Sequence, residues 1–504
     1  MAAPPPPPLL LGALLVALLR GASSAPQPLA ARPVEVTVGV LLPGRNLRFP
    51  WARPRVQPAL SLALEALQPQ QSLAVRTAFF DSEDGDESGN CKFEITPRVS
   101  FDILGRLGVP SVLLGMGCPV AFWLVHVPAD IERWQLLLLR AGVYQSGIIN
   151  PARTVYGGPT GPNISAFLAQ LLGHFNWTSR AAFVFSQEKR DPWPSSPYLW
   201  GLEEELEDTP NFTARIHQHQ QPGETVRFIQ ANGRVVYIFG SLEMMQKVMH
   251  LAQAQKMTTG DYVFLYVDIW GESLRAEGHR EAAKPWQSKE GQDAGGLREA
   301  FQTVLVVTPH EPQTPEYRRF QSQLILRAQE RYGLVVNDSL GTLVAGCFHD
   351  VLLLYLKALN ETLQESGTIR NTSCILEKMR GLKIQGVTGT VSLNCDYERE
   401  TDFDLWAMKD VETGEYQVVG HYMGSEKWIN WTGPIHWKKG GPPLDNPPCV
   451  FDMDDPSCGK SGCVQGSEGF DLTGLSALAI PKPAPFIPSA TSSGDPSARQ
   501  DNPK

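Results

Sequence analysis

The chain has 504 residues, 19% of them charged and 42% hydrophobic, with 44 basic and 53 acidic residues and a formal net charge of −9. This composition is typical of a globular protein with a hydrophobic core and excludes a disordered chain, and the length alone predicts about three domains. The acidic excess argues against a nucleic-acid-binding protein, because such proteins need a basic surface to replace phosphate counterions.

The first 25 residues are predicted to be a signal peptide. An apolar run at 9–19 is too short to cross a bilayer, and small residues at 21–25 suit cleavage near Ala25. Prolines stand where a signal peptide normally carries positive charge, so a signal anchor is the alternative interpretation. We expect the chain to enter the secretory pathway.

Sequons support this expectation of export. Seven asparagines begin an N-x-[ST] sequon, which predicts a glycoprotein with glycans on exposed loops. The predicted acceptors are Asn163, Asn176, Asn211, Asn337, Asn360, Asn371 and Asn430.

The eight cysteines are predicted to be largely oxidised, as is usual for exported proteins. None forms a C-x-x-C pair, which argues against a zinc or thioredoxin-type site. Cys347 lies in an apolar helical stretch and is expected to pack there unpaired. Short separations in the sequence favour the bonds Cys91–Cys118 and Cys449–Cys458. A third predicted bond, Cys374–Cys395, joins two of the three cysteines that are left, and Cys463 is expected to be free or intermolecular.

Between residues 34 and 440, predicted strands alternate with predicted helices. In the first part, strands are expected at 34–43, 74–80 and 111–114, and a helix at 55–67. The alternation restarts near residue 165, with helices expected at 165–172, 202–206 and 242–257 and strands at 180–185, 234–239 and 261–267. Continuous apolar strands between amphipathic helices indicate parallel sheets in an α/β fold with two lobes.

No established catalytic motif is present, and we predict no enzyme, no metal site and no organic cofactor. The sequence lacks H-E-x-x-H, G-x-S-x-G and G-x-G-x-x-G, so an enzyme would have to use carboxylates that no motif marks. His217 and His219 could share one side of a strand and bind a metal. Without an acidic or cysteine partner nearby, an exposed polar strand face is the favoured interpretation.

Long blocks of the sequence carry a family resemblance. The stretches at 260–274, 297–308, 386–389 and 399–408 resemble the ectodomain of the natriuretic peptide receptors. Residues 174–178, 229–233 and 445–458 resemble the B type in particular, the receptor guanylate cyclase for C-type natriuretic peptide. The resemblance extends over residues 36–458.

The resemblance implies the type I periplasmic-binding-protein fold, in which a hinge joins two Rossmann-like lobes with parallel sheets. The ligand-binding ectodomain would then occupy residues 26–458 as two interleaved lobes, the second beginning near residue 165. In this family a dimer of ectodomains binds one peptide hormone. The implied partners are a natriuretic peptide, with the C type favoured, and a second copy of the chain or a full-length receptor.

The resemblance also implies a chloride ion buried in one lobe. The pocket pattern of the family maps onto Ser82, Gly117 and Cys118. A hydroxyl and two consecutive backbone N–H groups, held by the Cys91–Cys118 bond, would form a small anion-binding nest. The alternative is that these residues only form a tight turn.

Several positions that contact the hormone in the family differ here. Val120 replaces an aromatic residue, Phe93 an acidic residue of the A type, and Trp200 a glutamate. Because a few anchors dominate the energy of an interface, these changes are expected to weaken binding of a cationic hormone. Candidate replacement anchors, with core or ordinary surface positions as the alternative, are Tyr198, Trp200, His217 and His219.

Residues 459–504 are predicted to form a disordered tail without a transmembrane helix. In the family, the membrane helix begins with a sequence similar to residues 475–480 of this chain, but here prolines follow at positions 481, 483 and 485. Six apolar residues cannot cross ~30 Å of hydrocarbon. We therefore expect a secreted hormone-binding ectodomain without cyclase activity. The alternatives are a membrane guanylate cyclase receptor whose C-terminal half is missing from the sequence, and the same fold with another ligand between its lobes.

Overall fold

The structure, a computed structural model, describes most of the chain between residues 33 and 451. The described ranges are 33–44, 51–67, 73–81, 105–115, 136–141, 153–186, 212–268, 284–287, 296–336 and 339–451, with the single residues 47, 103, 273 and 293. The predicted signal peptide (1–25), the predicted helix at 202–206 and the predicted tail (459–504) lie outside these residues.

Among the described residues, five strands form a first, parallel sheet in the order β2-β1-β3-β4-β5. Both of its faces are covered, because Val38 and Val40 pack in one apolar cluster while Leu41 and Leu113 pack in another. The three strands predicted in this region are confirmed. The bounds are β1 (Val34–Leu42), β2 (Leu73–Asp81), β3 (Val112–Gly115), β4 (Leu137–Arg140) and β5 (Thr154–Tyr156).

Eight strands of the described chain form a second, mixed sheet in the order β15-β14-β13-β10-β9-β8-β6-β7. The part from β10 to β7 is parallel, whereas β13, β14 and β15 form an antiparallel meander beside β10. The prediction of two parallel sheets is therefore correct only for the first. The bounds are β6 (Arg180–Ser186), β7 (Thr213–His219), β8 (Val235–Phe239), β9 (Val263–Val267), β10 (Val304–Pro309), β13 (Phe403–Asp410), β14 (Glu415–Met423) and β15 (Trp428–Trp431).

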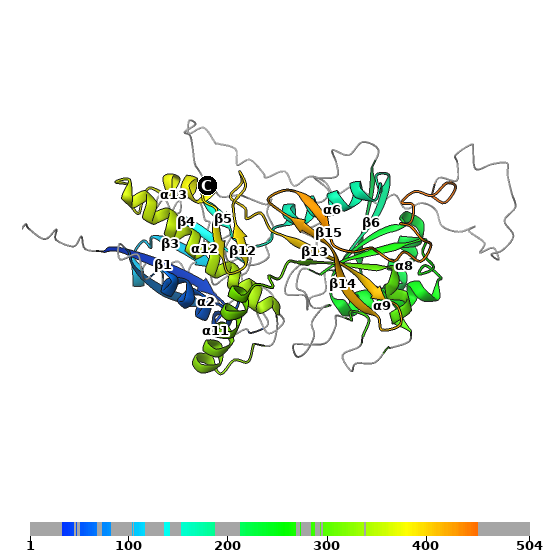
Figure 1. Cartoon of the computed structure of the whole chain (residues 1–504), viewed down its shortest axis with the longest axis horizontal. Helices are drawn as coiled ribbons and strands as arrows, with labels where there is room; N and C mark the ends of the chain where they lie inside the picture. Colours follow the sequence, from blue (N-terminus) through cyan, green and yellow to red (C-terminus); the bar gives the residue numbers. More distant parts are fainter. Residues whose placement is uncertain are drawn as a thin grey trace, which may run out of the picture. The chain divides into compact units, whose positions relative to one another are not determined.

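Three of the helices drawn in Figure 1 begin at a capping residue in the sequence. The hydroxyls of Thr160, Ser241 and Thr314 each accept a backbone N–H from the first turn of the helix that follows. Gly333 ends one of these helices in the left-handed conformation, with φ 62°. The helices are α2 (Arg53–Ala66), α6 (Gly161–His174), α8 (Pro222–Asn232), α9 (Leu242–Ala254), α10 (Leu297–Ala300), a 3-10 turn η1 (Phe301–Thr303), α11 (Pro315–Tyr332), α12 (Ser339–Gln364) and α13 (Thr372–Gly381).

The chain passes between the two sheets three times within the described residues. It leaves the first sheet after β5, leaves the second after β10, and returns to the second at β13. In between, α11 and α12 pack on α2, and α13 packs on α12. A small hairpin of β11 (Ile384–Gly386) and β12 (Gly389–Val391) also packs against α12. The α/β periplasmic-binding-protein-like fold class is confirmed.

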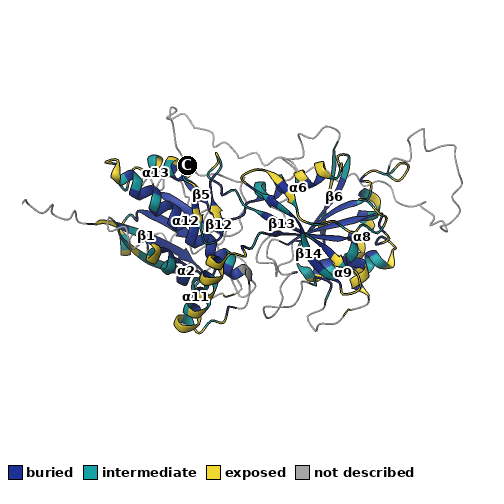
Figure 2. Cartoon of the chain, in the orientation of Figure 1, coloured by how far each residue is buried: buried dark blue, intermediate teal, exposed yellow. Residues whose placement is uncertain are grey.

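Helix α12 is the central core helix beside the first sheet. By length and composition it could cross a membrane from Gly341 to Gln364, but 89% of its most apolar window is buried inside the fold. Figure 2 shows most of this helix in the colour of buried residues. A Cβ on Gly157, directly after β5, would lie 2.5 Å from the Cβ of Val351. The helix therefore packs directly on the end of β5 as a core element.

Candidate functional site

Most residues predicted to bind chloride or hormone lie outside the described residues. These are Ser82, Gly117 and Cys118 of the chloride pocket, Tyr198 and Trp200 of the hormone site, and Cys91, Cys458 and Cys463 among the cysteines. The predicted replacements Phe93 and Val120 also lie outside them.

The two candidate histidines lie on β7, the edge strand of the second sheet. The ring of His217 stacks on Phe228 of α8, with centroids 4.7 Å apart and an interplanar angle of 18°. His219 is 7% exposed, and its Nδ1 lies 2.7 Å from the hydroxyl oxygen of Thr225. The two histidines share a face as predicted, but α8 covers this face, so the prediction of an exposed polar face is wrong. His219 therefore does not provide a surface anchor for a hormone.

The environment of His217 differs from that of an ordinary surface histidine. Burial lowers the pKa of His217 below its usual value, and the charge of Glu224 opposes this shift.

The neighbouring residue on the other face of the strand, Ile216, is 40% exposed. An exposed apolar side chain at a sheet edge is a candidate contact for a partner.

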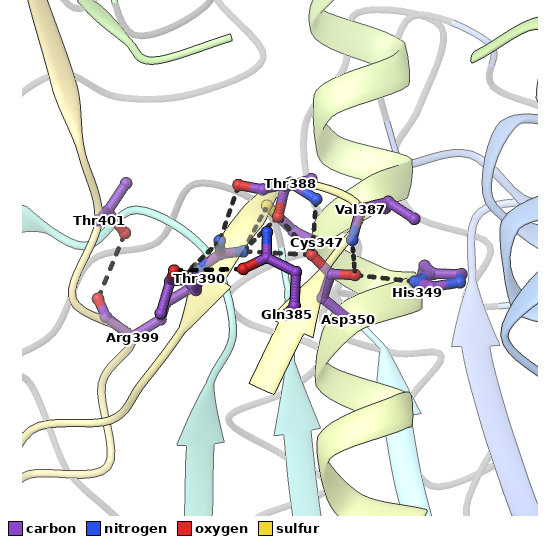
Figure 3. Close-up of polar contacts among 9 residues, drawn as sticks. All are labelled: Cys347, His349, Asp350, Gln385, Val387, Thr388, Thr390, Arg399 and Thr401. Atoms are coloured by element: carbon purple, nitrogen blue, oxygen red, sulfur yellow. Dashed lines mark hydrogen bonds and ion pairs between the residues drawn. The ribbon is translucent and has the colours of Figure 1, made fainter. Parts of the chain in front are cut away.

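A buried polar cluster lies where α12 meets the β11–β12 hairpin (Figure 3). The Asp350 side chain is fully buried and accepts hydrogen bonds from the backbone N–H groups of Val387 at 2.8 Å and Thr388 at 2.9 Å. Nδ1 of His349 lies 2.8 Å from the Asp350 carboxylate. Arg399 donates to the Thr388 hydroxyl at 2.7 Å and to its carbonyl at 3.1 Å, and one of its nitrogens lies 3.8 Å from the Asp350 carboxylate.

Two glycines make this cluster possible. A Cβ on Gly386 would lie 2.3 Å from the Asp350 carboxylate, so a larger residue would displace it. Gly389 has φ +99°, a conformation that residues with a Cβ rarely adopt. Residues 386–389 and the segment that begins at Arg399 therefore contact each other. Asp350 links residues 386–389 to helix α12.

The electrostatics of the cluster favour an ionised aspartate. Burial alone would raise the pKa of Asp350, but the hydrogen bond from His349 and the charge of Arg399 hold that pKa below its ordinary value. Four hydrogen-bond donors, namely the His349 ring, the backbone N–H groups of Val387 and Thr388 and the Thr388 hydroxyl, and one cation thus stabilise one carboxylate. This arrangement positions the chain segment that enters β13, and it leaves the carboxylate no free surface for a ligand.

The cysteines agree only in part with the predicted bonds. Cys449 is disulfide-bonded, as predicted, and its predicted partner lies outside the described residues. Cys374 and Cys395 are free thiols, so the predicted bond between them is wrong. Cys374 lies in the first turn of α13, and the thiol of Cys395 lies in an exposed turn 3.5 Å from the Asp396 carboxylate. The bond was predicted by pairing cysteines that had no other partner in the sequence. Such pairing cannot show whether the two Cβ atoms come within the ~4 Å that a disulfide bond requires.

We expect Cys347 to resist alkylation in the folded chain while Cys395 reacts. Cys347 is buried and unpaired, as predicted, and burial raises the pKa of its thiol to about 11. Little thiolate is then present at neutral pH, and the sulfur is shielded from the reagent. Iodoacetamide labelling followed by peptide mass spectrometry checks this, with labelling in urea and a Cys395→Ser variant as controls. Rapid labelling of Cys347 in the folded protein would contradict the prediction.

Five of the seven predicted glycan acceptors lie in the described residues. Asn360 is 8% exposed within α12, so the expectation of an exposed loop is wrong there. Asn163 is half-buried in the first turn of α6, where its side-chain oxygen is shielded from solvent. Asn176, Asn371 and Asn430 are exposed, and Asn211 and Asn337 lie outside the described residues.

Comparison with known proteins identifies relatives over most of the chain. Residues 55–411 match the receptor family ligand binding region. Atrial natriuretic peptide receptor 2 of Rattus norvegicus and of Homo sapiens are each 45% identical over 465 residues, which cover 89% of this chain and 42% of the relative. Atrial natriuretic peptide receptor 3 of Mus musculus is 27% identical over 469 residues, which cover 90% of this chain and 83% of the relative.

The fold and the comparisons lead to the same assignment. The matched region extends from α2 to the end of β13 and includes the buried polar cluster around Asp350. The chain spans about two fifths of the length of the receptor 2 relatives. It belongs to the natriuretic peptide receptor family of receptor ligand-binding regions.

Proposed function

We propose that this chain is an extracellular receptor domain that binds a natriuretic peptide. The observation that carries the proposal is the 45% identity to atrial natriuretic peptide receptor 2 along 89% of the chain. The preference for the C-type peptide rests on the resemblance to the B type. The net charge of −9 also favours association with a cationic peptide.

We further propose that one lobe binds chloride through Ser82, Gly117 and Cys118. Parallel β2 and β3 flank β1, so Asp81 and Gly115, the last residues of β2 and β3, lie at the same end of the sheet. The carboxyl ends of parallel strands are a common place for ligands in α/β folds. A Cβ on Gly115 would lie 2.2 Å from the carbonyl oxygen of Leu41, which is consistent with tightly packed backbone at this edge.

We also propose that the chain is secreted and sequesters hormone. The support is the predicted signal peptide together with the prolines at 481, 483 and 485, which prevent the apolar run at 475–480 from continuing as a membrane helix. Pairing with a second copy or with a full-length receptor belongs to the same proposal. A membrane guanylate cyclase receptor is the competing interpretation, and it predicts that the chain stays with the membrane fraction.

The full chain expressed in mammalian cells tests these proposals. We expect it in the culture medium, and we expect the purified protein to bind C-type natriuretic peptide in chloride buffer and more weakly in gluconate buffer. A peptide of scrambled sequence is the matched control. Failure to bind in both buffers would overturn the hormone proposal, and equal binding in both would overturn only the chloride site. Retention of the chain in membranes would overturn secretion.

A further inference from the structure

Three metal-ligand side chains meet on one face of the second sheet. Asp404 of β13 and His421 of β14 are directly opposite each other in the antiparallel register. His310 follows the end of β10, and its backbone N–H donates to the carbonyl of Asp402 at 3.0 Å, which continues the pairing of the strands. Residues opposite one another in a sheet lie on the same face. The strand register thus brings together residues that are far apart in the sequence.

Both imidazoles direct the same ring nitrogen at one carboxylate. His421 Nδ1 lies 2.8 Å from Asp404 Oδ1, and His310 Nδ1 lies 2.9 Å from Asp404 Oδ2. The two rings are edge to face, with centroids 4.3 Å apart. In the part of the chain that the structure describes, this is the one group of three such residues whose ligand atoms all lie within 4.8 Å of one another.

The burial of the group suits an ion that enters from solvent. The side chain of Asp404 is 7% exposed, whereas those of His310 and His421 are 31% and 22% exposed. Two further acidic residues, Glu311 and Asp402, interact electrostatically with the group. A buried carboxylate with acidic neighbours and two accessible imidazoles offers both negative charge and nitrogen donors.

We propose that His310, Asp404 and His421 bind a divalent transition-metal ion, with Zn²⁺ as the favoured ion. Two imidazole nitrogens and a carboxylate oxygen are common protein ligands for Zn²⁺, with bonds of ~2.0–2.2 Å. Ligand atoms around a tetrahedral ion stand about 3.3 Å apart at such bond lengths. The nitrogen–oxygen separations to Asp404, 2.8 Å for His421 and 2.9 Å for His310, are therefore only a few tenths of an ångström too short, and the two histidine nitrogens lie within 4.8 Å of each other. With the ion bound, each neutral imidazole would carry its proton on Nε2 and coordinate through Nδ1, and water would complete the coordination.

The position of the group gives the ion a structural consequence. His310 lies in the segment between β10 and α11, and Asp404 follows the segment that joins β12 to β13. These are two of the three segments in which the chain passes between the sheets. An ion held by both would cross-link them and would stabilise the folded chain by mass action. This inference does not depend on hormone binding.

The test is a titration of the chelator-treated full chain with Zn²⁺ alone and Co²⁺ alone. Cys374 and Cys395 are free, so they are first alkylated to remove competing thiolate ligands. We expect Zn²⁺ to bind with one-to-one stoichiometry and to raise the melting temperature, and Co²⁺ to give the visible absorption bands of a four- or five-coordinate ion. Absence of stoichiometric binding would overturn the proposal.

Single variants assign the ion to these residues. His310→Ala and His421→Ala are each expected to weaken Zn²⁺ binding more than about tenfold, because each removes one of three protein ligands. His436→Ala, at an exposed histidine on the segment after β15, is the matched control and should bind like the unchanged chain. Melting without metal shows whether each variant folds. If folded variants at 310 and 421 keep full affinity, the ion is bound elsewhere and the proposal is wrong.

Discussion

Replacing Asp350 by alanine is expected to destabilise the folded chain by about 3–5 kcal/mol. Its fully buried carboxylate accepts the backbone N–H groups of Val387 and Thr388 and faces the guanidinium of Arg399. Without the carboxylate, these two backbone donors, the His349 ring, the Thr388 hydroxyl and one cation all lose this partner while they stay buried, and nothing replaces the interaction. Urea unfolding followed by circular dichroism measures the change.

Controls separate the loss of charge from a general effect on α12. Asp350→Asn keeps the shape and one acceptor oxygen, so we expect an intermediate loss of stability. Glu361→Ala, at a half-buried position on the same helix, should change the unfolding free energy by only about 0.5 kcal/mol. A loss below about 1 kcal/mol in Asp350→Ala would contradict the role assigned to the cluster.

The pH dependence of stability provides a second readout of the same contact. The pKa of Asp350 is lower in the folded chain than its ordinary value, so the folded state favours the charged form. Its contribution is fully present above the unfolded pKa of about 3.9 and is lost as the pH falls towards the folded pKa. Acidification should therefore cost the unchanged chain more stability than it costs Asp350→Asn.

The elements that sequence analysis predicted well are those with a strong local signal. The continuous apolar runs of β8 and β9, and the apolar spacing along α2 and α9, require no knowledge of distant residues. The antiparallel meander from β13 to β15 was not predicted. Its strands carry polar residues such as Asp404 and His421 between apolar ones, so they lack the continuous pattern of a buried parallel strand.

The candidate sites were less predictable, because their contacts join residues that are far apart in the sequence. Asp350 and Thr388 are separated by 38 positions and His310 and Asp404 by 94. No spacing rule links such pairs, and only the strand register and the packing of α12 bring them together. The alternation of His217 and His219 did predict a shared face, but which partner covers that face depends on α8.

The last part of the described chain returns to the second sheet and is held there by a second buried aspartate. Asp445 is 7% exposed and accepts the backbone N–H groups of Ser179 at 2.6 Å and Arg180 at 3.1 Å, at the start of β6. The indole N–H of Trp177 donates to the carbonyl of Pro443 at 2.8 Å. These contacts dock the segment that ends in the disulfide-bonded Cys449.

Replacing Asp445 by alanine is therefore expected to release this segment and to cost roughly 1–3 kcal/mol, because two donors at the start of β6 lose their acceptor. Hydrogen exchange should accelerate at residues 443–451 and at Ser179 and Arg180, while the strands of the first sheet stay protected. Asn446→Ala changes the exposed neighbour and is the matched control. Unchanged exchange in Asp445→Ala would show that the indole contact alone holds the segment. Uniformly faster exchange would mean instead that Asp445 supports the whole fold.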